Sequence, residues 1–450
     1  MNIKSDMLKD PILKSMMIFS IPILISLVFQ NLYHMVDIAI VGNFLGTASL
    51  SAIGATSSLY NLLMSFSNGL GNGICIVFGR SYGSGDHNEV KKGVASSIVI
   101  GAVLSLCFVL LTFTGLKPMM RMLNTPVEVF EESYSYVGFI VLFAGITFFY
   151  NLLSAAFRAV GNSTTPLVVL VISSVLNVIL DFIFVAALHM GVRGTAIATV
   201  ASQLVSVIIC IVYIVKYEKI LIPELRHFVP DFSLYKELLG QGISMAMMMT
   251  IVNCGSFALQ SAINSLGSLT ISAYVTARNI YSFAMMPLNA IASACATFTS
   301  QNMGAKLYKR VLEGVRLANI STFAINCLAI VFVFLTAKWF VMKVSGSDDA
   351  MLIDYAVRYL KFGVCFYPIL GLLCNYRNAL QGCGKKIVPL ISSFIDLFAK
   401  FGFTFLIIPR IGYTGVIIAE PLIWVVMTIQ LAASYSSQKK ELKQLLSFKA

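Results

Sequence analysis

The stretch FSIPILISLVFQNLYHMVDIAIVGNFLG, residues 19–46, is apolar enough to cross a lipid bilayer and nevertheless carries Asp37 near its middle. A carboxylate at that depth costs about 2.5–3.5 kcal/mol, so such a residue usually faces a bundle interior or a wet cavity. Pro22 predicts a kink in the helix and is a candidate hinge. Four polar residues recur every three or four positions and share one helix face: Ser26, Gln30, His34 and Asp37. The pattern predicts a transport helix; the alternative is a carboxyl that only fixes packing.

The composition of the whole chain agrees with a membrane protein. Of 450 residues, 58% are hydrophobic and only 12% are charged, with a mean hydropathy of +0.85. The apolar runs are continuous rather than alternating, which indicates helices and not a β-barrel. The nine cysteines form no CxxC pair and predict neither a disulfide framework nor a zinc site. Residues 1–14 are expected to be a retained cytosolic leader. The predicted fold class is an all-α polytopic membrane protein.

Continuous apolar segments predict twelve spans in two groups of six. The first group is 16–44, 52–79, 94–116, 133–157, 166–188 and 194–216, and the second is 239–265, 271–300, 314–337, 357–380, 387–409 and 412–436. The predicted organisation is an N-terminal six-helix lobe (1–216), a cytosolic inter-lobe loop (217–236), a C-terminal six-helix lobe (237–437) and a cytosolic tail (438–450).

The positive charge of the chain is a topology signal. Of its 32 Lys and Arg residues, 22 fall in the loops that share a side with the termini and nine on the other side, with Lys400 inside a span. This bias predicts a multi-pass protein of the cytoplasmic membrane with both termini in the cytoplasm. Because the loop distribution accounts for the net charge of +12, that charge is no argument for nucleic-acid binding. The sequence also lacks a GxxxxGK[ST] loop, so neither nucleic acid nor nucleotide is an expected partner.

The two halves repeat one another. Residues 78–94 align with 299–315, and 156–166 with 379–389, which matches Gly161 to Gly384. Residues 191–199 align with 412–420. Repeats that begin at equivalent spans of each half share one orientation, and parallel repeats are a recurring transporter plan.

Few ionisable residues lie inside spans. In the first half, Asp181 is one turn beyond Asn177, and a neighbouring span presents Thr199. Two carboxylates with amide and hydroxyl oxygens are suited to a hard monovalent cation or an exchangeable proton. The alternative is a hydrogen-bond network that holds this half together. Candidates for a cavity lining are Asn151, Ser154 and Tyr150, with Tyr376 in the second half.

The second half carries further titratable residues. Asp396 and Lys400 are four residues apart on one helix, which favours an intrahelical ion pair over a functional site. Glu420 occupies the repeat position of Thr199 and is equally suited to a second titratable role. Arg278 is expected to face an outer vestibule or to cap a helix end. No metal site is expected beyond a possible Na⁺ site.

These residues resemble the multidrug and toxic compound extrusion (MATE) family over nearly the whole chain. The resemblance rests on the first span, on the FGRSYGSGD and SQNMGAK repeats, on FRAVGNSTTP and on NVILDFIF. It implies two six-helix lobes around a central cavity and a cation site at Asp37, Asn177, Asp181 and Thr199. Gln30 and Asn151 match cavity positions. The seventh span lacks an acid, which favours a DinF-like or MepA-like arrangement.

The sequence therefore predicts a secondary antiporter that exports organic, often cationic, drugs in exchange for Na⁺ or H⁺. It is expected to need no cofactor, to act as a monomer among membrane lipids, and not to be an enzyme, because no nucleophile–base pair or HExxH motif is found. The alternative is a flippase or exporter of a lipid-linked or polysaccharide precursor. Such a protein is expected to have a strongly cationic cavity.

Overall fold

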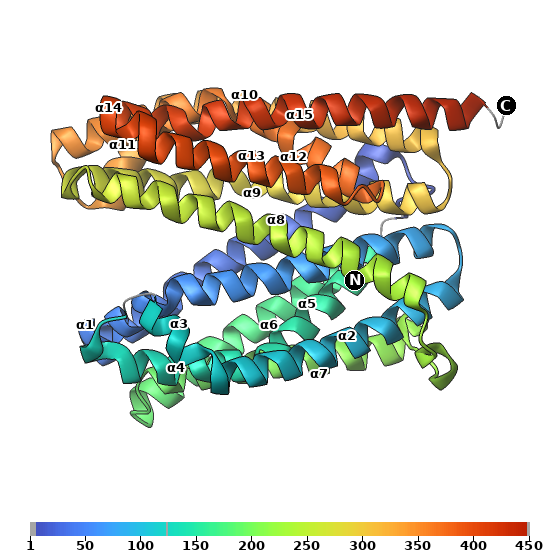
Figure 1. Ribbon diagram of the computed structural model, residues 1–450, viewed down its shortest axis with the longest axis horizontal. Coiled ribbons are helices and arrows are strands. Elements are labelled where there is room, and N and C mark those ends of the chain that lie inside the picture. Colours follow the sequence, from blue (N-terminus) through green and yellow to red (C-terminus); the bar gives the residue numbers. More distant parts are fainter. Residues whose placement is uncertain (1–5, 123–124, 448–450) are drawn as a thin grey trace. The chain divides into compact units, whose positions relative to one another are not determined.

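A computed structural model describes residues 6–122 and 125–447, and within these the chain is helical without a β-strand (Figure 1). The α-helices are α1 (Ile12–Gly83), α2 (His87–Thr114), α3 (Leu116–Met122), α4 (Phe130–Leu142), α5 (Ala144–Ala159), α6 (Thr164–Asp181), α7 (Val192–Tyr217), α8 (Phe232–Asn264), α9 (Ser268–Gly304), α10 (Tyr308–Ser345), α11 (Ala350–Cys365), α12 (Tyr367–Gly382), α13 (Ile387–Gly402), α14 (Ile408–Ile411) and α15 (Tyr413–Ser447). Short 3₁₀ turns are η1 (Val127–Val129), η3 (Lys219–Leu221) and η4 (Leu225–Phe228), and π-helical turns are η2 (Phe182–Ala187) and η5 (Phe403–Ile407).

The described helices confirm the predicted spans. Ten are long and apolar enough to cross a membrane, and two bent pairs, 127–159 and 350–382, raise the number to twelve. The helix α1 contains two of these spans, which are separated at Gly46, where a φ of 83° and a ψ of −173° interrupt the helix. Only glycine adopts that backbone region readily, so Gly46 ends one span and allows the next to begin. The chain is a polytopic membrane protein.

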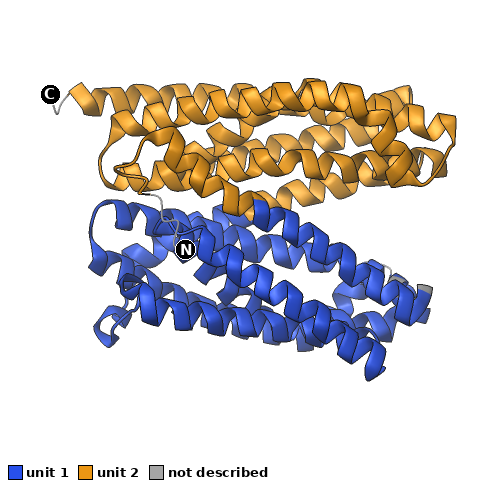
Figure 2. Ribbon diagram, turned by 180° about the vertical axis from the view of Figure 1, so that it is seen from behind, with its two compact units in different colours: residues 1–4, 25–246 blue, residues 5–24, 247–450 orange. Residues whose placement is uncertain are grey.

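The described residues divide into two compact units (Figure 2). Unit 1 comprises residues 25–246, and unit 2 comprises residues 6–24 together with 247–447. Relative to the predicted lobes (1–216 and 237–437), residues 6–24 belong to unit 2, and residues 217–246 belong to unit 1. Met7, Phe19 and their neighbours are buried in the unit 2 core. Arg310 Nη2 also donates to the carbonyl oxygens of Met7 and Asp10, at 3.1 and 2.8 Å.

The internal repeat is visible in the backbone. Residues with positive φ recur 221 or 223 positions apart, in the pairs Gly46 and Gly267, Gly85 and Lys306, Gly161 and Gly384, and Gly191 and Gly412. The π-helical turns begin at Phe182 and Phe403, which are again 221 residues apart. The bent helix pairs also correspond, with bends of 46° and 53°. Each half of the chain therefore repeats the same main helices and breaks, apart from the short helices α3 and α14.

Candidate functional site

A cavity of about 210 Å³ lies within unit 1, among α1, α5, α6 and α7. Gln30 and His34, on the polar face of the first span, line this cavity, as do Asn151, Asn177 and Thr199. With Tyr150, six residues that the sequence singles out therefore meet around one space. The described lining is Gln30, Tyr33, His34, Tyr60, Met64, Asn68, Thr147, Tyr150, Asn151, Leu170, Ser173, Ser174, Asn177, Thr199, Ser202, Gln203 and Ser206.

The carboxyl groups of Asp37 and Asp181 lie close enough to one another for an electrostatic interaction. Neither acid is among the described residues that line the cavity, whereas His34 and Asn177, about one helical turn before Asp37 and Asp181, both line it. Asp181, the last residue of α6, is fully buried, and Asp37 is half-buried. Asp37 Oδ1 and both Asp181 oxygens receive no N–H or O–H from any other described residue. Asn177 lies one helical turn before Asp181 on α6, so the carboxyl pair and the cavity wall are neighbours along this helix. Two adjacent acids without a cationic partner repel when both are ionised, so a proton or a monovalent cation stabilises them.

Tyrosines surround the carboxyl pair, and they are not among the residues expected from the sequence. Tyr33 and Tyr60 lie close enough to Asp37 for an electrostatic interaction, and Tyr136 lies close to both acids. Tyr33 is one turn before Asp37, so its place near the polar face is a signal that the sequence carries. Tyr60 and Tyr136 come from distant segments, and no local pattern marks them.

Two further predicted residues take different places. Ser154 is buried and does not line the cavity; it contacts Tyr150, which does. Its position one turn beyond Tyr150 and Asn151 on α5 carries it past the end of the cavity. Pro22 lies inside α1, where the helix continues from the residues of unit 2 into those of unit 1. The interruption of helical φ and ψ within α1 lies at Gly46 and not at Pro22.

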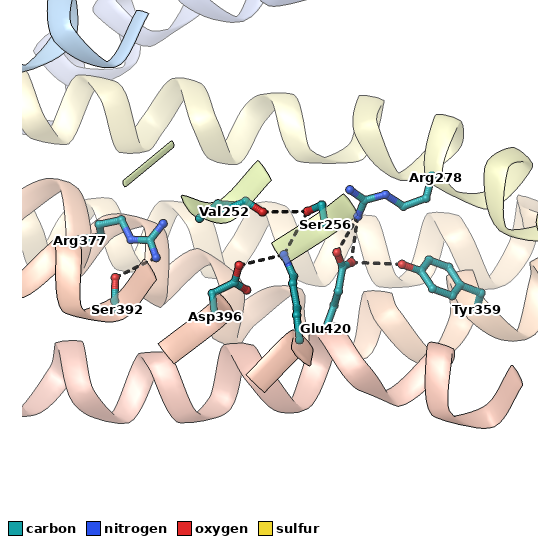
Figure 3. A network of polar contacts seen from close by, with 9 residues as sticks. Val252, Ser256, Arg278, Tyr359, Arg377, Ser392, Asp396 and Glu420 are labelled. Carbon is teal, nitrogen blue, oxygen red and sulfur yellow. Dashed lines mark hydrogen bonds and ion pairs between the residues drawn. The ribbon is translucent and has the colours of Figure 1, made fainter. Parts of the chain in front are cut away.

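Unit 2 contains the ion pair predicted between Asp396 and Lys400 (Figure 3). Lys400 Nζ is 2.9 Å from Asp396 Oδ2, and the two side chains are only 6% and 5% exposed, respectively, for Asp396 and Lys400. Lys400 also donates to Ser256 Oγ at 3.2 Å, and Ser256 in turn donates to the carbonyl of Val252 at 3.1 Å. The pair ties α13 to α8. Its geometry agrees with the structural interpretation.

Glu420 is bound by Arg278, a pairing that the sequence does not indicate (Figure 3). Arg278 Nη1 donates to both carboxylate oxygens, at 3.0 and 2.9 Å, and Tyr359 donates to Oε2 at 3.1 Å. The contact that the structure shows for Arg278 is this carboxylate, and its predicted place at an outer vestibule stays a prediction. No local pattern reveals the pairing, because the partners are 142 residues apart. The charge of Glu420 is balanced by Arg278, whereas Asp37 and Asp181 have no cationic partner among the described residues.

Tyr376 lies in unit 2, where it is half-buried and its ring stacks on Tyr435 at 5.0 Å between centroids. Its predicted contribution to a substrate cavity stays a prediction. Among the described residues, no group of three or more His, Cys, Asp and Glu side chains is arranged to hold a metal ion.

One family profile matches both halves of the chain. The MatE family profile matches residues 22–183 and 244–406, one segment in each half of the chain. The "Probable multidrug resistance protein YpnP" of Bacillus subtilis is 26% identical over 414 residues, which cover 91% of this chain and 92% of that protein. The "Multidrug export protein MepA" of Staphylococcus aureus is 23% identical over 420 residues, which cover 92% of each chain.

Solved structures show the same fold. A crystal structure of MATE in complex with MaL6 superposes with a TM-score of 0.91 at 22% identity, covering 99% of this chain and 100% of that one. An outward-facing multidrug resistance MATE family transporter of the MOP superfamily gives a TM-score of 0.90 at 22% identity, with coverages of 98% and 99%.

Proposed function

This chain belongs to the MatE family, and from that premise we propose that it is a secondary antiporter that exports organic, often cationic, compounds in exchange for H⁺ or Na⁺. The observation that carries the proposal is the carboxyl pair of Asp37 and Asp181 beside a polar cavity in unit 1. The names of two relatives, a probable multidrug resistance protein and a multidrug export protein, support the same substrate class.

Coupling follows from the electrostatics of the pair. When both acids are ionised and the cavity is open to the outside, repulsion between them favours uptake of a proton or Na⁺. Asn177 and Thr199 offer amide and hydroxyl oxygens beside them, which are suitable ligands for a hard cation. Uptake neutralises the site and removes its attraction for a cationic substrate, so the two cations exclude one another.

The conformational step is assigned to the first span. The acid pair lies on α1 and α6, while residues 6–24 of the chain, which include the start of the same α1, belong to unit 2. Pro22 removes one backbone hydrogen bond close to the point where α1 leaves unit 2. A change in charge at Asp37 is therefore transmitted along α1 toward Pro22. Pro22 is the proposed hinge.

The energy source is an ion gradient across the cytoplasmic membrane, with both chain termini in the cytoplasm. Moving one charge across 100 mV supplies about 2.3 kcal/mol, to which the concentration gradient adds. No cofactor takes part, and the substrates are small organic molecules.

The test is transport by the purified protein in proteoliposomes, with a pH gradient and a Na⁺ gradient imposed separately. We expect one gradient to drive uptake of a fluorescent organic cation, and Asp37→Asn and Asp181→Asn to abolish that response. Asp354→Asn, in an exposed ion pair on α11, is the matched control and should transport as the wild type does. Gradient-driven transport that survives both substitutions contradicts the proposed coupling site. Failure of every organic cation under either gradient contradicts the substrate class.

A further inference from the structure

The unit 1 cavity has a wall of unusual chemistry. Of the seventeen described residues that line it, only Met64 and Leu170 lack a hydroxyl, a side-chain amide or an imidazole, and none of the seventeen is Asp, Glu, Lys or Arg. A pocket for a purely lipophilic compound is lined mostly by apolar side chains. Recognition in this cavity must therefore depend on hydrogen bonds whose direction the wall sets.

Four hydroxyl groups of the wall donate their hydrogen atoms to backbone carbonyls of their own helices. On α7, Thr199 donates to the carbonyl of Thr195 at 3.0 Å, Ser202 to that of Thr199 at 2.9 Å, and Ser206 to that of Ser202 at 3.0 Å. On α6, Ser173 donates to the carbonyl of Leu170 at 3.0 Å. A hydroxyl has one hydrogen and two lone pairs, so each of these oxygens is left as an acceptor. This set of hydroxyls (Ser173, Thr199, Ser202 and Ser206) forms an acceptor stripe.

A second observation points to a ligand beside the acceptor stripe. Asn177 is 2% exposed, lines the cavity, and has no hydrogen-bond partner for either Oδ1 or Nδ2 within the described part of the chain. Ser174 Oγ, also buried in the wall, is equally without a partner among those residues. Buried polar groups are hydrogen-bonded in the great majority of cases, because a group left unpaired loses its bonds to water without replacement. Asn177 is therefore expected to bond to what the cavity holds.

We propose that this cavity binds the protonated amine of its substrate, and that it selects ammonium groups that carry N–H donors over quaternary ammonium groups that carry none. This inference rests on the proposed function, whose substrate class it narrows. The acceptor stripe and Asn177 Oδ1 receive the N–H hydrogens. The rings of Tyr33, Tyr60 and Tyr150 line the same cavity and offer a cation favourable faces.

The acceptor stripe is what separates this ligand class from the alternatives. Tyrosine rings and a nearby carboxylate attract any organic cation, quaternary or not. A quaternary ammonium, however, cannot donate to Ser202, Ser206 or Asn177 and leaves them desolvated. A hydrogen bond to a charged group changes affinity by about tenfold or more, so the loss is measurable even if only one bond forms.

The test is binding, not transport, to the full-length protein in detergent at neutral pH and in potassium buffer free of Na⁺. The probes are benzylamine, N-methylbenzylamine, N,N-dimethylbenzylamine and benzyltrimethylammonium, which keep one ring and one charge while the N–H count falls from three to none. Calorimetric titration should show affinity falling along the series, with the quaternary compound at least about tenfold weaker than the primary amine. Equal or tighter binding of the quaternary compound overturns the proposal, as does the absence of binding by any member.

Variants place the effect on the acceptor stripe. Ser202→Ala should weaken benzylamine while leaving benzyltrimethylammonium unchanged, so the ratio of their affinities approaches one. Ser300→Ala is the matched control, because Ser300 is equally buried and donates to the carbonyl of Thr297 at 2.9 Å, but in unit 2. An unchanged ratio in Ser202→Ala overturns the assignment. A protein that transports cations under a gradient but shows no preference along the series refutes only this inference and leaves the antiporter function standing.

Discussion

The charged residues inside the membrane fall into two kinds, which are distinguished by their partners. Asp396 and Glu420 each face a cation within hydrogen-bonding distance, Lys400 and Arg278 respectively. Asp37 and Asp181 face each other instead. A buried acid with a fixed cationic partner is neutralised permanently, whereas two acids together need a mobile cation. The residues that exchange ions are therefore expected in unit 1, and the ion pairs of unit 2 are expected to be structural.

The pair of Asp396 and Lys400 gives a direct test of that distinction. Asp396→Leu leaves Lys400 buried without its counter-ion and should destabilise the protein by about 3–5 kcal/mol. Asp396→Leu/Lys400→Met removes both charges and should recover most of the stability, because a buried ion pair gains little over well-packed apolar side chains. Thermal unfolding in detergent measures the stability of both variants.

Transport by the double variant decides the role of this pair. If the pair is structural, the double variant should retain gradient-driven transport. Loss of transport in a double variant of normal thermal stability would assign the pair to the mechanism.

At the scale of the elements, the breaks in the helices depend on particular glycines. At Gly46 the backbone φ is 83°, and a methyl group added at its Cα would meet no atom within 4 Å, so any cost of substitution is backbone strain alone. We expect Gly46→Ala to destabilise the protein by about 1–3 kcal/mol. Gly54, in the next span, also has open space around it but has helical φ, so Gly54→Ala is the matched control. Thermal unfolding should show Gly54→Ala unchanged or slightly stabilised; equal effects of the two substitutions would contradict the strain argument.

The linker between α7 and α8, residues 218–231, makes two side-chain contacts with the start of α2. Lys91 Nζ is 2.9 Å from Glu224 Oε1, and His227 Nε2 is 2.6 Å from Asn88 Oδ1. His227 Nδ1 accepts the backbone N–H of Glu224, which closes the turn. The Lys91 hydrogen bond holds the pKa of Glu224 below its usual range. This contact therefore stabilises the linker fully at pH values above the ordinary pKa of a glutamate. The stabilisation is lost as the pH falls through the lowered pKa of Glu224.

Removing either of these two contacts should increase local opening of the linker without unfolding the membrane spans. We expect Lys91→Ala and Asn88→Ala to raise amide hydrogen exchange over residues 219–228, with α2 and α7 unchanged. Lys92→Ala removes a neighbouring charge that forms no ion pair among the described residues and should leave the exchange as in the wild type. If only Lys92→Ala exchanged faster, the contacts of Lys91 and Asn88 would not be the ones that hold the linker.

At the scale of the molecule, local patterns in the sequence predicted most of the fold. Apolar length predicts the spans, and the sequence repeat matches Gly161 to Gly384, two residues that share a positive φ, at 87° and 83°. The polar face of the first span predicts that Gln30 and His34 line a cavity. Contacts between distant segments carry no such local signal. The pairing of Arg278 with Glu420, and the packing of Phe19 in unit 2, depend on which helices meet.

The orientation of the whole chain is the last prediction, and α10 allows it to be tested at both ends of one helix. The basic-residue bias predicts that the end near Lys309 faces the cytoplasm and the end near Asp348 faces outward. Both residues are exposed; Lys309 lies in the first turn of α10, and Asp348 lies three residues beyond its last residue, Ser345. In a chain with its native cysteines replaced by serine or alanine, a membrane-impermeant maleimide should label Asp348→Cys in intact cells and reach Lys309→Cys only after permeabilisation. The reverse pattern would invert the topology, and with it the direction in which the proposed antiporter moves its substrate.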